Sequence, residues 1–389
     1  MPKPTTPRVL IITPFFYPNL GGVETHLSKL TDYLSSHQYH TTVLTYKPLS
    51  IKVPYLKNES HDNLNIHRFW WFGLGLFDKT TPYPLLQFIY IVPGLLFSSL
   101  FYCLKNRNNF DVIHAHGFAA AFITRIINIF LPSKIIVVST HFIYHRLNPK
   151  TVSTKLFRWV FNGFNTILAV SEQSRLELSK IGINPKKIKK FRYWIDQKEF
   201  IPKDKTKYRQ ILKIPKNYNL VVFFAGRFIK MKGIFNLLKV AQKSPANILF
   251  LLAGDGPDSN QLTNESAKVK NFRILGRLPH LMIVDYMAAS DIVILPSLSE
   301  EALPNLVIEA LSCGRPIITT DKGSVVEMYD TSVGIKINPT PDNILKSILS
   351  LYKNPKKIQL LSNNAKPYAI KHYSENNADI IIKSYYDQR

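Results

Sequence analysis

The sequence predicts an α/β protein with two doubly wound parallel sheets, and three observations support this. Short apolar runs, such as residues 9–13, lead into a glycine-containing loop and then a helical pattern. This strand–loop–helix unit is the repeat from which such sheets are built. The unit starts again at residue 220, after a basic stretch broken by turns. The 389 residues are enough for two domains of ordinary size.

Composition limits the class of protein and of partner. With 46% hydrophobic and 20% charged residues, the chain is globular rather than disordered. Its formal net charge of +24 implies an anionic partner, which is a nucleotide, an anionic lipid or a nucleic acid. Cys103 and Cys313 form neither a disulfide framework nor a zinc spacing, so we expect a reducing compartment. The first residues lack the apolar segment of a signal peptide, so no signal peptide is expected.

The first half reads as a series of strands and helices. After the strand at 9–13, Gly21 and Gly22 open a helix through Leu27, Leu30 and Leu34. Glycines let a phosphate approach the backbone closely, although a plain strand–helix turn is the alternative. Further strands are expected at residues 40–46, 65–69, 112–115, 135–140 and 167–170, with Ser171 as the N-cap of the helix that follows the last.

Residues 80–104 carry no charge and are rich in aromatic side chains. The run is long enough to span a bilayer. A single crossing is not expected, because the strands on either side of it should belong to one sheet. Pro93 and Gly94 break the run near its middle, so we expect two short helices. They pack in the core or, alternatively, contact a membrane interface or an acceptor.

Two histidines stand at strand ends. His116 closes the strand at 112–115, and His141 follows the strand at 135–140. Ligands of doubly wound sheets bind at the carboxyl ends of the strands. We therefore favour His116 as a site residue over a purely structural histidine.

The second half contains the strongest signals. The strand at 220–225 leads into Gly226, Arg227 and Lys232. An arginine forks onto phosphate oxygens, and a lysine supplies a point charge. Strands are also expected at 248–253 and 291–295, with a strand end at 273–278.

Residues 297–320 read as loop, helix, cap and strand. Asn305 is the expected N-cap of a helix over 306–313, Gly314 follows the helix, and a strand covers 317–320. Glu301 lies in the loop and Glu309 in the helix, near its N-terminus. A helix N-terminus binds anions, whereas carboxylates accept hydrogen bonds from sugar hydroxyls. The combination predicts a nucleotide sugar as ligand. An amphipathic surface helix with two solvated acids is the alternative.

These segments resemble a known family. Residues 301–310, Glu-Ala-Leu-Pro-Asn-Leu-Val-Ile-Glu-Ala, are similar to the E-x7-E motif of retaining GT-B glycosyltransferases, the family 4-like group that includes sucrose synthase and phosphatidylinositol mannosyltransferase. The segment from Gly226 to Gly233 resembles that family's Gly-Arg-x4-Lys-Gly, and residues 21–24 resemble its Gly-Gly-x-Glu loop. Glu300 departs from the usual pattern, but the spacing to Glu309 selects Glu301 as the motif residue.

The resemblance implies a GT-B fold, with two Rossmann-like domains facing across a cleft. Residues 1–198 would form the acceptor-binding domain and 199–370 the nucleotide-sugar domain, and a helix within 371–389 would cross back to the first. The implied reaction moves mannose, glucose or N-acetylglucosamine, with retention, from a UDP- or GDP-linked sugar to a hydroxyl of a lipid-linked or cell-envelope glycan. No cofactor is expected. No Asp-x-Asp triplet is present, so no divalent metal is expected either.

The resemblance also assigns residues. His116, Arg227, Lys232 and Glu301 would be catalytic. Glu24, His26 and His141 would contact the acceptor. The donor would be bound by Gly21, Gly22, Gly226, Arg227, Lys232, Arg277, Leu278, Glu301, Ala302, Leu303, Pro304, Asn305 and Glu309.

Partners follow from charge and resemblance together. We expect an anionic membrane surface and a cytoplasmic, peripheral location. Nucleic acid is not expected, because the sequence has no RNP motif, helix-turn-helix signature or zinc spacing. A catalytically silent sugar-binding relative and a transferase with a soluble acceptor remain as alternatives.

Overall fold

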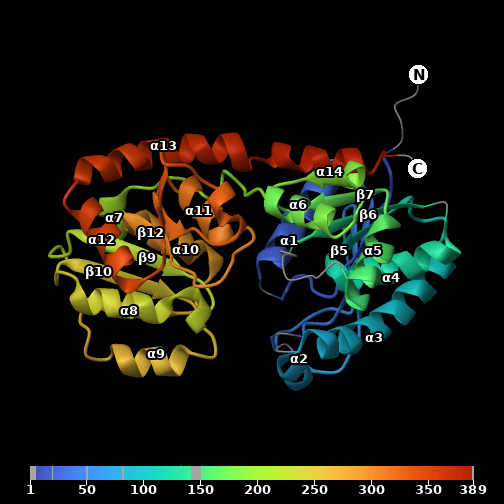
Figure 1. The fold of residues 1–389 in the computed structure, drawn as a ribbon, viewed down its shortest axis with the longest axis horizontal. Helices are drawn as coiled ribbons and strands as arrows, with labels where there is room; N and C mark the ends of the chain where they lie inside the picture. The colour runs from blue at the N-terminus through green and yellow to red at the C-terminus, as the bar shows by residue number, and fades with distance from the viewer. Residues whose placement is uncertain are drawn as a thin grey trace. The chain divides into compact units, whose positions relative to one another are not determined.

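The computed structural model describes residues 6–19, 21–49, 51–80, 83–132, 134–141 and 150–387. The chain divides into two compact units. Unit 1 comprises residues 1–193 and 375–389, and unit 2 comprises residues 194–374. Each contains a largely or wholly parallel sheet covered by helices, so the α/β class and the two Rossmann-like domains are confirmed (Figure 1).

The sheet of unit 1 has the strand order β3-β4-β2-β1-β5-β6-β7-β8, and in the described residues only β3 runs antiparallel to its neighbour. Buried apolar side chains on its strands and covering helices form the core. The strands are β1 Val9–Ile12, β2 Thr41–Tyr46, β3 Asn58–His61, β4 Leu64–Phe69, β5 Val112–His116, β6 Ile135–Thr140, β7 Thr166–Ala169 and β8 Ile188–Lys190. Its helices are α1 Gly22–Ser36, α2 Leu74–Thr80, α3 Pro84–Lys105, α4 Gly117–Phe130, α5 Val152–Asn162, α6 Glu172–Lys180 and α14 Ala378–Ser384, with short 3-10 turns at Pro185–Lys187 and Glu375–Asn377.

The sheet of unit 2 has the order β11-β10-β9-β12-β13-β14, and its described strands are all parallel. They are β9 Leu220–Ala225, β10 Ile248–Ala253, β11 Phe272–Gly276, β12 Ile292–Leu295, β13 Ile317–Thr320 and β14 Gly334–Ile337. The helices are α7 Lys205–Ile211, α8 Ile234–Lys243, α9 Ser259–Ser266, α10 His280–Ala289, α11 Asn305–Ser312, α12 Pro341–Tyr352 and α13 Pro355–Tyr373, with 3-10 turns at Lys230–Lys232 and Ser324–Glu327.

The end of the chain packs into unit 1. Tyr385 bonds to His114 of β5 at 2.8 Å, and Asp387 pairs with Lys189 of β8 at 2.5 Å. These contacts seat the C-terminal residues on the first sheet. The first unit ends at Tyr193, a few residues before the boundary that we expected at 198.

Four expected strands have the predicted bounds, whereas three strands were missed. The strands at 135–140, 220–225, 248–253 and 317–320 match β6, β9, β10 and β13, while β3, β8 and β14 were not expected. In β3 the residues are Asn-Glu-Ser-His, and three of the four are exposed. A polar edge strand has no apolar pattern by which the sequence would reveal it.

The expected break at Pro93 and Gly94 is wrong, because α3 continues through both as one helix of 22 residues. A proline inside a helix disturbs the backbone bonds of the preceding turn. The bond lost at Pro93 is the one to Ile89 O. Side chains bond to the next two carbonyls: Trp71 Nε1 donates to Tyr90 O at 2.8 Å, and the Tyr46 hydroxyl to Ile91 O at 2.6 Å. These bonds anchor the turn around the proline to neighbouring segments.

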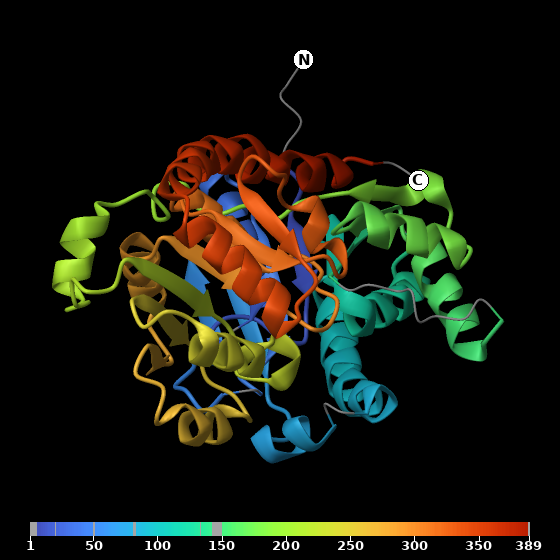
Figure 2. The same ribbon diagram turned by 60° about the vertical axis from the view of Figure 1, so that its left-hand side comes forward.

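By length and composition, α3 could cross a membrane. Core helices of soluble proteins pass the same test, so these two properties do not show a crossing. Strands β4 and β5, on either side of α3 in sequence, belong to one sheet. Figures 1 and 2 both show α3 lying beside α4, and Phe88 of α3 contacts Phe118 of α4. Residues 81–82 of the uncharged run lie outside the described part of the chain.

The start of α11 also differs from expectation. The helix begins at Asn305, with Pro304 in the N-cap position, so Asn305 is not the cap. Gly314 follows the helix with a φ of 70°, as expected.

Candidate active site

The candidate residues of unit 2 gather where its chain order reverses. β9, the first strand of the unit, lies between β10 and β12. The loop after β9 carries Arg227 and Lys232, and the loop after β12 carries Glu301. Because β9 and β12 are parallel neighbours, both loops leave the same edge of the sheet. Such a switch point is where ligands of doubly wound sheets bind.

A cation and a carboxylate meet at this edge. Lys232 Nζ lies 2.6 Å from Glu301 Oε1, and both side chains are largely buried. The Ser297 hydroxyl donates to the same oxygen at 2.5 Å. Glu301 Oε2 has no bonded partner among the described residues. The carboxylate is therefore held at one oxygen and available at the other.

Two glycines keep these loops in place. Gly233 follows Lys232 with a φ of +76°, and a Cβ there would lie 2.1 Å from the carbonyl oxygen of Pro296. Gly323 has a φ of +77°, and a Cβ there would lie 2.5 Å from Glu301 O. Ser324 N donates to that same Glu301 oxygen at 2.8 Å. Both positions need glycine because its backbone adopts positive φ without strain and leaves room for the neighbouring chain.

Glu309 lies in α11 with its side chain 11% exposed. Its Oε1 is 3.7 Å from Nε2 of His280, whose Nδ1 lies 3.0 Å from Glu199 Oε1. Glu309 is the main cause of the raised pKa of His280, against the effect of burial, and Glu199 adds to it. His280 therefore connects two carboxylates of unit 2.

The other expected donor residues of unit 2 lie around the same edge. Arg227 is exposed, and Gly226 donates its N–H to Ala253 O at 3.0 Å. Arg277 and Leu278 follow β11, with Arg277 exposed. The segment that enters α11 comprises Ala302, Leu303, Pro304 and Asn305, and of these only Leu303 is fully buried.

In unit 1 the glycine loop forms the start of α1. Gly21 is the N-cap, Gly22 the first helical residue and Glu24 lies two residues further on. The Glu24 carboxylate folds back over this end, so that a Cβ on Gly21 would lie 2.3 Å from Glu24 Oε2. Burial raises the pKa of this carboxyl group. A carboxylate thus lies at the N-terminus that we expected near the donor diphosphate.

Four histidines of unit 1, His26, His114, His116 and His141, form a buried cluster with tyrosine. His116 Nδ1 lies 3.1 Å from His141 Nε2, and His141 Nδ1 lies 2.7 Å from the Tyr193 hydroxyl. The ring of His26 stacks on Tyr193 with centroids 4.3 Å apart. His116 Nε2 is buried and has no hydrogen-bond partner among the described residues. An unpaired buried polar atom is costly, and this one lies at a strand end where ligands bind.

Burial keeps these rings neutral. It lowers the pKa of His114 and of His141 to about 3, and the pKa values of His26 and His116 are also well below their usual range. Repulsion from the neighbouring imidazoles acts in the same direction on His26, His114 and His116. At neutral pH the cluster therefore offers hydrogen bonds and no positive charge.

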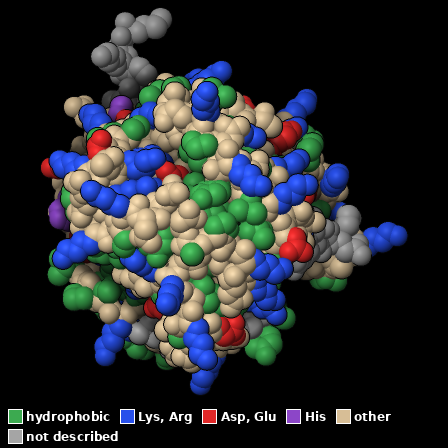
Figure 3. Space-filling view, turned by 90° about the vertical axis from the view of Figure 1, so that its left-hand side faces the viewer, with side chains coloured by type: hydrophobic (Ala, Val, Ile, Leu, Met, Phe, Trp, Pro, Cys, Tyr) green, Lys and Arg blue, Asp and Glu red, His purple; other side chains and the backbone are tan. Residues whose placement is uncertain are grey.

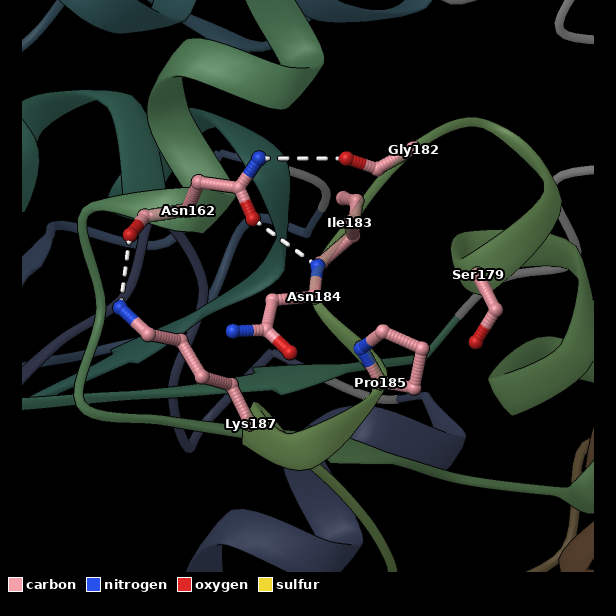
Figure 4. A pocket seen from close by; sticks show the side chains of 7 residues that line it. All are labelled: Asn162, Ser179, Gly182, Ile183, Asn184, Pro185 and Lys187. Carbon is pink, nitrogen blue, oxygen red and sulfur yellow. Dashed lines mark hydrogen bonds between the residues drawn. The ribbon is translucent and has the colours of Figure 1, made fainter.

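A separate hollow of about 590 Å³ lies on unit 1 between the ends of α5 and α6 (Figure 4). Much of its polar wall is bonded internally, since Asn162 Nδ2 donates to Gly182 O and Lys187 Nζ donates to Asn162 O. None of the residues expected to be functional lines it. Its lining residues are Asn162, Ser179, Gly182, Ile183, Asn184, Pro185 and Lys187.

Sequence reasoning missed four residues that support the candidate sites: Ser297, His280 and Gly323 in unit 2, and Tyr193 in unit 1. Ser297 is only four residues from Glu301 and lies in the segment that we had identified. His280 reaches Glu309 and Tyr193 reaches His141 from distant parts of the chain, so no local pattern marks them. Gly323 stands three residues after a predicted strand, which a search for tight turns would have flagged.

Solved structures show the class of fold. The sucrose-phosphate synthase of Thermosynechococcus elongatus matches 98% of this chain and 98% of its own, with a TM-score of 0.79 and 16% identity. Anabaena Alr3699/HepE in complex with UDP matches 98% of this chain and 100% of its own, with a TM-score of 0.75 and 17% identity. The fold is that of a GT-B glycosyltransferase.

Sequence comparison gives the family. A model described as "Glycosyltransferase Family 4" matches residues 20–197, and one described as "Glycosyl transferases group 1" matches residues 204–368. The chain belongs to the family 4-like glycosyltransferases.

Curated relatives agree with this assignment. The phosphatidylinositol N-acetylglucosaminyltransferase GPI3 subunit of Saccharomyces cerevisiae is 24% identical over 86% of this chain and 72% of its own. The putative teichuronic acid biosynthesis glycosyltransferase TuaC of Bacillus subtilis is 28% identical over 51% of this chain and 50% of its own.

We predict that acid destabilises the protein through the four buried histidines. In the unfolded chain a histidine gains a proton near pH 6.5. The folded protein keeps His26, His114, His116 and His141 neutral at that pH, because their pKa values are lowered. Below pH about 6.5 the unfolded state binds more protons, so the free energy of unfolding falls as pH falls.

Each histidine contributes up to about 1.4 kcal/mol of this loss for each further pH unit. Urea unfolding at pH 7.5 and pH 5.5 measures the difference in the free energy of unfolding. Protonation of His280 stabilises the folded state as pH falls, because the pKa of His280 is raised. Equal or greater stability at pH 5.5 would contradict the prediction.

Proposed function

We propose that this glycosyltransferase moves a hexosyl unit, which is mannose, glucose or N-acetylglucosamine, from a UDP- or GDP-linked sugar to a hydroxyl, with retention at the anomeric carbon. The observation that carries this is the pairing of Lys232 with Glu301 at the switch point of unit 2. A diphosphate needs cations, and a hexose needs hydrogen-bond acceptors for its hydroxyls. The site offers one of each, side by side.

Arg227 and Lys232 would stabilise the charge that builds up on the diphosphate as it leaves. The partial positive charge at the N-terminus of α11 would add to this field. Gly21 and Gly22 of unit 1 are proposed to contact the same group through their backbone.

Glu301 would accept hydrogen bonds from the sugar hydroxyls through Oε2, since Oε1 already binds Lys232 and Ser297. Glu309 would hold the ribose hydroxyls, and His116 a hydroxyl of the transferred sugar. We assign no side chain as general base. The donor phosphate would take the proton of the acceptor hydroxyl, and no metal ion is required.

Structural likeness and relatives guide the choice of donor. One similar structure is a complex with UDP, and the yeast relative is named as an N-acetylglucosaminyltransferase. UDP-N-acetylglucosamine is therefore the first donor to test. Because the yeast relative acts on phosphatidylinositol and TuaC is named for teichuronic acid, we propose a lipid-linked or cell-envelope glycan as acceptor.

The donor test has two stages. Thermal shift with UDP, GDP and ADP identifies the base, because a ligand that binds only the folded state raises the melting temperature. Nucleotide release from UDP- and GDP-sugars then measures turnover, with and without excess EDTA. We expect UDP to give the largest shift and release to survive EDTA. If a nucleotide binds but no donor sugar releases it under any condition, a catalytically silent relative is favoured. If EDTA abolishes nucleotide release and added metal restores it, the enzyme requires a metal.

We predict that Arg227→Ala and Lys232→Ala each lower kcat/KM by about tenfold to a hundredfold, because each removes a charge-assisted bond to the leaving group. Lys230→Ala is the matched control, since Lys230 lies in the same short 3-10 turn and is exposed. It should retain activity. Circular dichroism checks that all three variants fold. Full activity of a folded Arg227→Ala, Lys232→Ala double variant would remove both residues from the site.

We also propose that unit 1 contacts the cytoplasmic face of an anionic membrane. α3 exposes an apolar face that includes Leu85, Ile89, Phe97 and Phe101, and both phenylalanines are 71% exposed. Lys105, at the end of the same helix, is exposed as well. Apolar insertion combined with attraction to anionic lipid is the usual pair of signals in peripheral binding. Figure 3 draws one face of the molecule, and on that face Lys and Arg side chains are spread out rather than gathered in one patch.

We predict that the protein floats with anionic vesicles and hardly with neutral ones. Salt near 1 M should weaken the attachment, because the Debye length falls to about 3 Å. Phe97→Ser with Phe101→Ser should weaken it further, whereas Leu360→Ser, at a site 61% exposed on unit 2, should not. If the protein stays unbound with anionic vesicles at low salt, a soluble acceptor becomes the better proposal.

A further inference from the structure

The structure assigns a direction to the hydrogen bonds that run from Tyr193 through His141 to His116, and we infer that Tyr193 and His141 are positioning residues that present His116 as an N–H donor at Nε2. All three side chains belong to unit 1 and are buried. They come from the ends of β5 and β6 and from the segment after β8. The inference deepens the proposed function, because it specifies the chemistry of the residue proposed to touch the sugar.

The direction follows from the hydroxyl of Tyr193. A phenol has a single proton to donate. The only hydrogen-bond partner of this hydroxyl among the described residues is His141 Nδ1, at 2.7 Å. If the hydroxyl accepted a bond from His141 instead, its own proton would be buried without an acceptor, which carries a desolvation penalty. Tyr193 therefore donates to His141 Nδ1.

The next two steps follow from the chemistry of imidazole. A neutral imidazole holds one proton, so His141 with an accepting Nδ1 carries its proton on Nε2. That nitrogen lies 3.1 Å from His116 Nδ1 and donates to it. His116 then accepts at Nδ1 and carries its own proton on Nε2. This is the buried atom for which the described part of the chain supplies no partner.

The direction limits what His116 is able to do. When Nε2 carries a proton, this nitrogen has no lone pair with which to take another. His116 therefore does not act as the base for an acceptor hydroxyl. It recognises an oxygen acceptor, such as a hydroxyl oxygen of the transferred sugar. The surrounding histidines also keep it from becoming a cation, because burial and neighbouring imidazoles lower its pKa. Both ring nitrogens of His141 bond to protein, which fits positioning better than contact with an acceptor.

The cluster contains its own matched control. Tyr385 is as buried as Tyr193, and its hydroxyl lies 2.8 Å from His114 Nδ1. His114 Nε2 pairs with the Ser139 hydroxyl at 2.8 Å and so ends a separate branch. Tyr385→Phe removes the same atom from the same kind of pair as Tyr193→Phe, but it does not touch the bonds that lead to His116.

Imidazole nitrogen NMR tests the direction without any substrate. In protein labelled with 15N-histidine, long-range proton–nitrogen correlations show which ring nitrogen carries the proton. Signals are assigned from His116→Asn and His141→Asn variants. We expect the Nε2–H tautomer for both rings in the wild type, a mixture in Tyr193→Phe and no change in Tyr385→Phe. A wild-type His116 with its proton on Nδ1, or unchanged tautomers in Tyr193→Phe, would overturn the inference.

Kinetics supply a second, separable readout. Tyr193→Phe should lower kcat by about fivefold to tenfold, the effect of one neutral hydrogen bond, with little change in the KM for the donor. Tyr385→Phe should match the wild type. Equal losses of kcat in both variants would point to a general packing effect and count against the inference. Failure of the proposed function would appear differently, as full activity in His116→Asn or none in the wild type, while the NMR result stands.

Discussion

The parallel pairing of β9 with β12 is the constraint on which the site of unit 2 depends. It sets the carboxyl ends of two strands side by side, although about 70 residues separate them in the chain. Lys232 and Glu301 meet only because of this pairing. Gly233 and Gly323 make the contact close, because each occupies a place where a Cβ would collide with the neighbouring backbone.

Desolvation plays the corresponding part in unit 1. Four histidines and two tyrosines are enclosed by the sheet, by α1 and by the end of the chain. Removal from water prevents the histidines from taking up protons, so they behave as neutral donors and acceptors whose roles are fixed by their bonds. A cluster that looks like a set of titrating groups in the sequence is therefore a rigid hydrogen-bonded framework at neutral pH.

The two units divide the chemistry in a way that suits sugar transfer. Unit 2 concentrates paired and unpaired charge at one edge of a sheet, which suits a diphosphate and a sugar with many hydroxyls. Unit 1 has neutral imidazoles and an exposed apolar helix, and we propose that they contact a hydroxyl-bearing acceptor with a lipid portion. The family 4-like assignment and the GT-B fold establish the class of enzyme in which this division of roles is proposed.

The sequence by itself determined the α/β class, most of the strands and the segments that carry Arg227, Lys232, Glu301 and Glu309. These features are local, because a strand followed by a glycine turn and a helix is specified by neighbouring residues. Tertiary structure decided three things that no local pattern contains. It kept α3 continuous through Pro93, where Trp71 and Tyr46 anchor the neighbouring turn, and it brought His280 to Glu309 across the fold. It also placed Tyr193 and His141 behind His116, because hydrogen bonds between side chains far apart in sequence form only once the sheet has assembled.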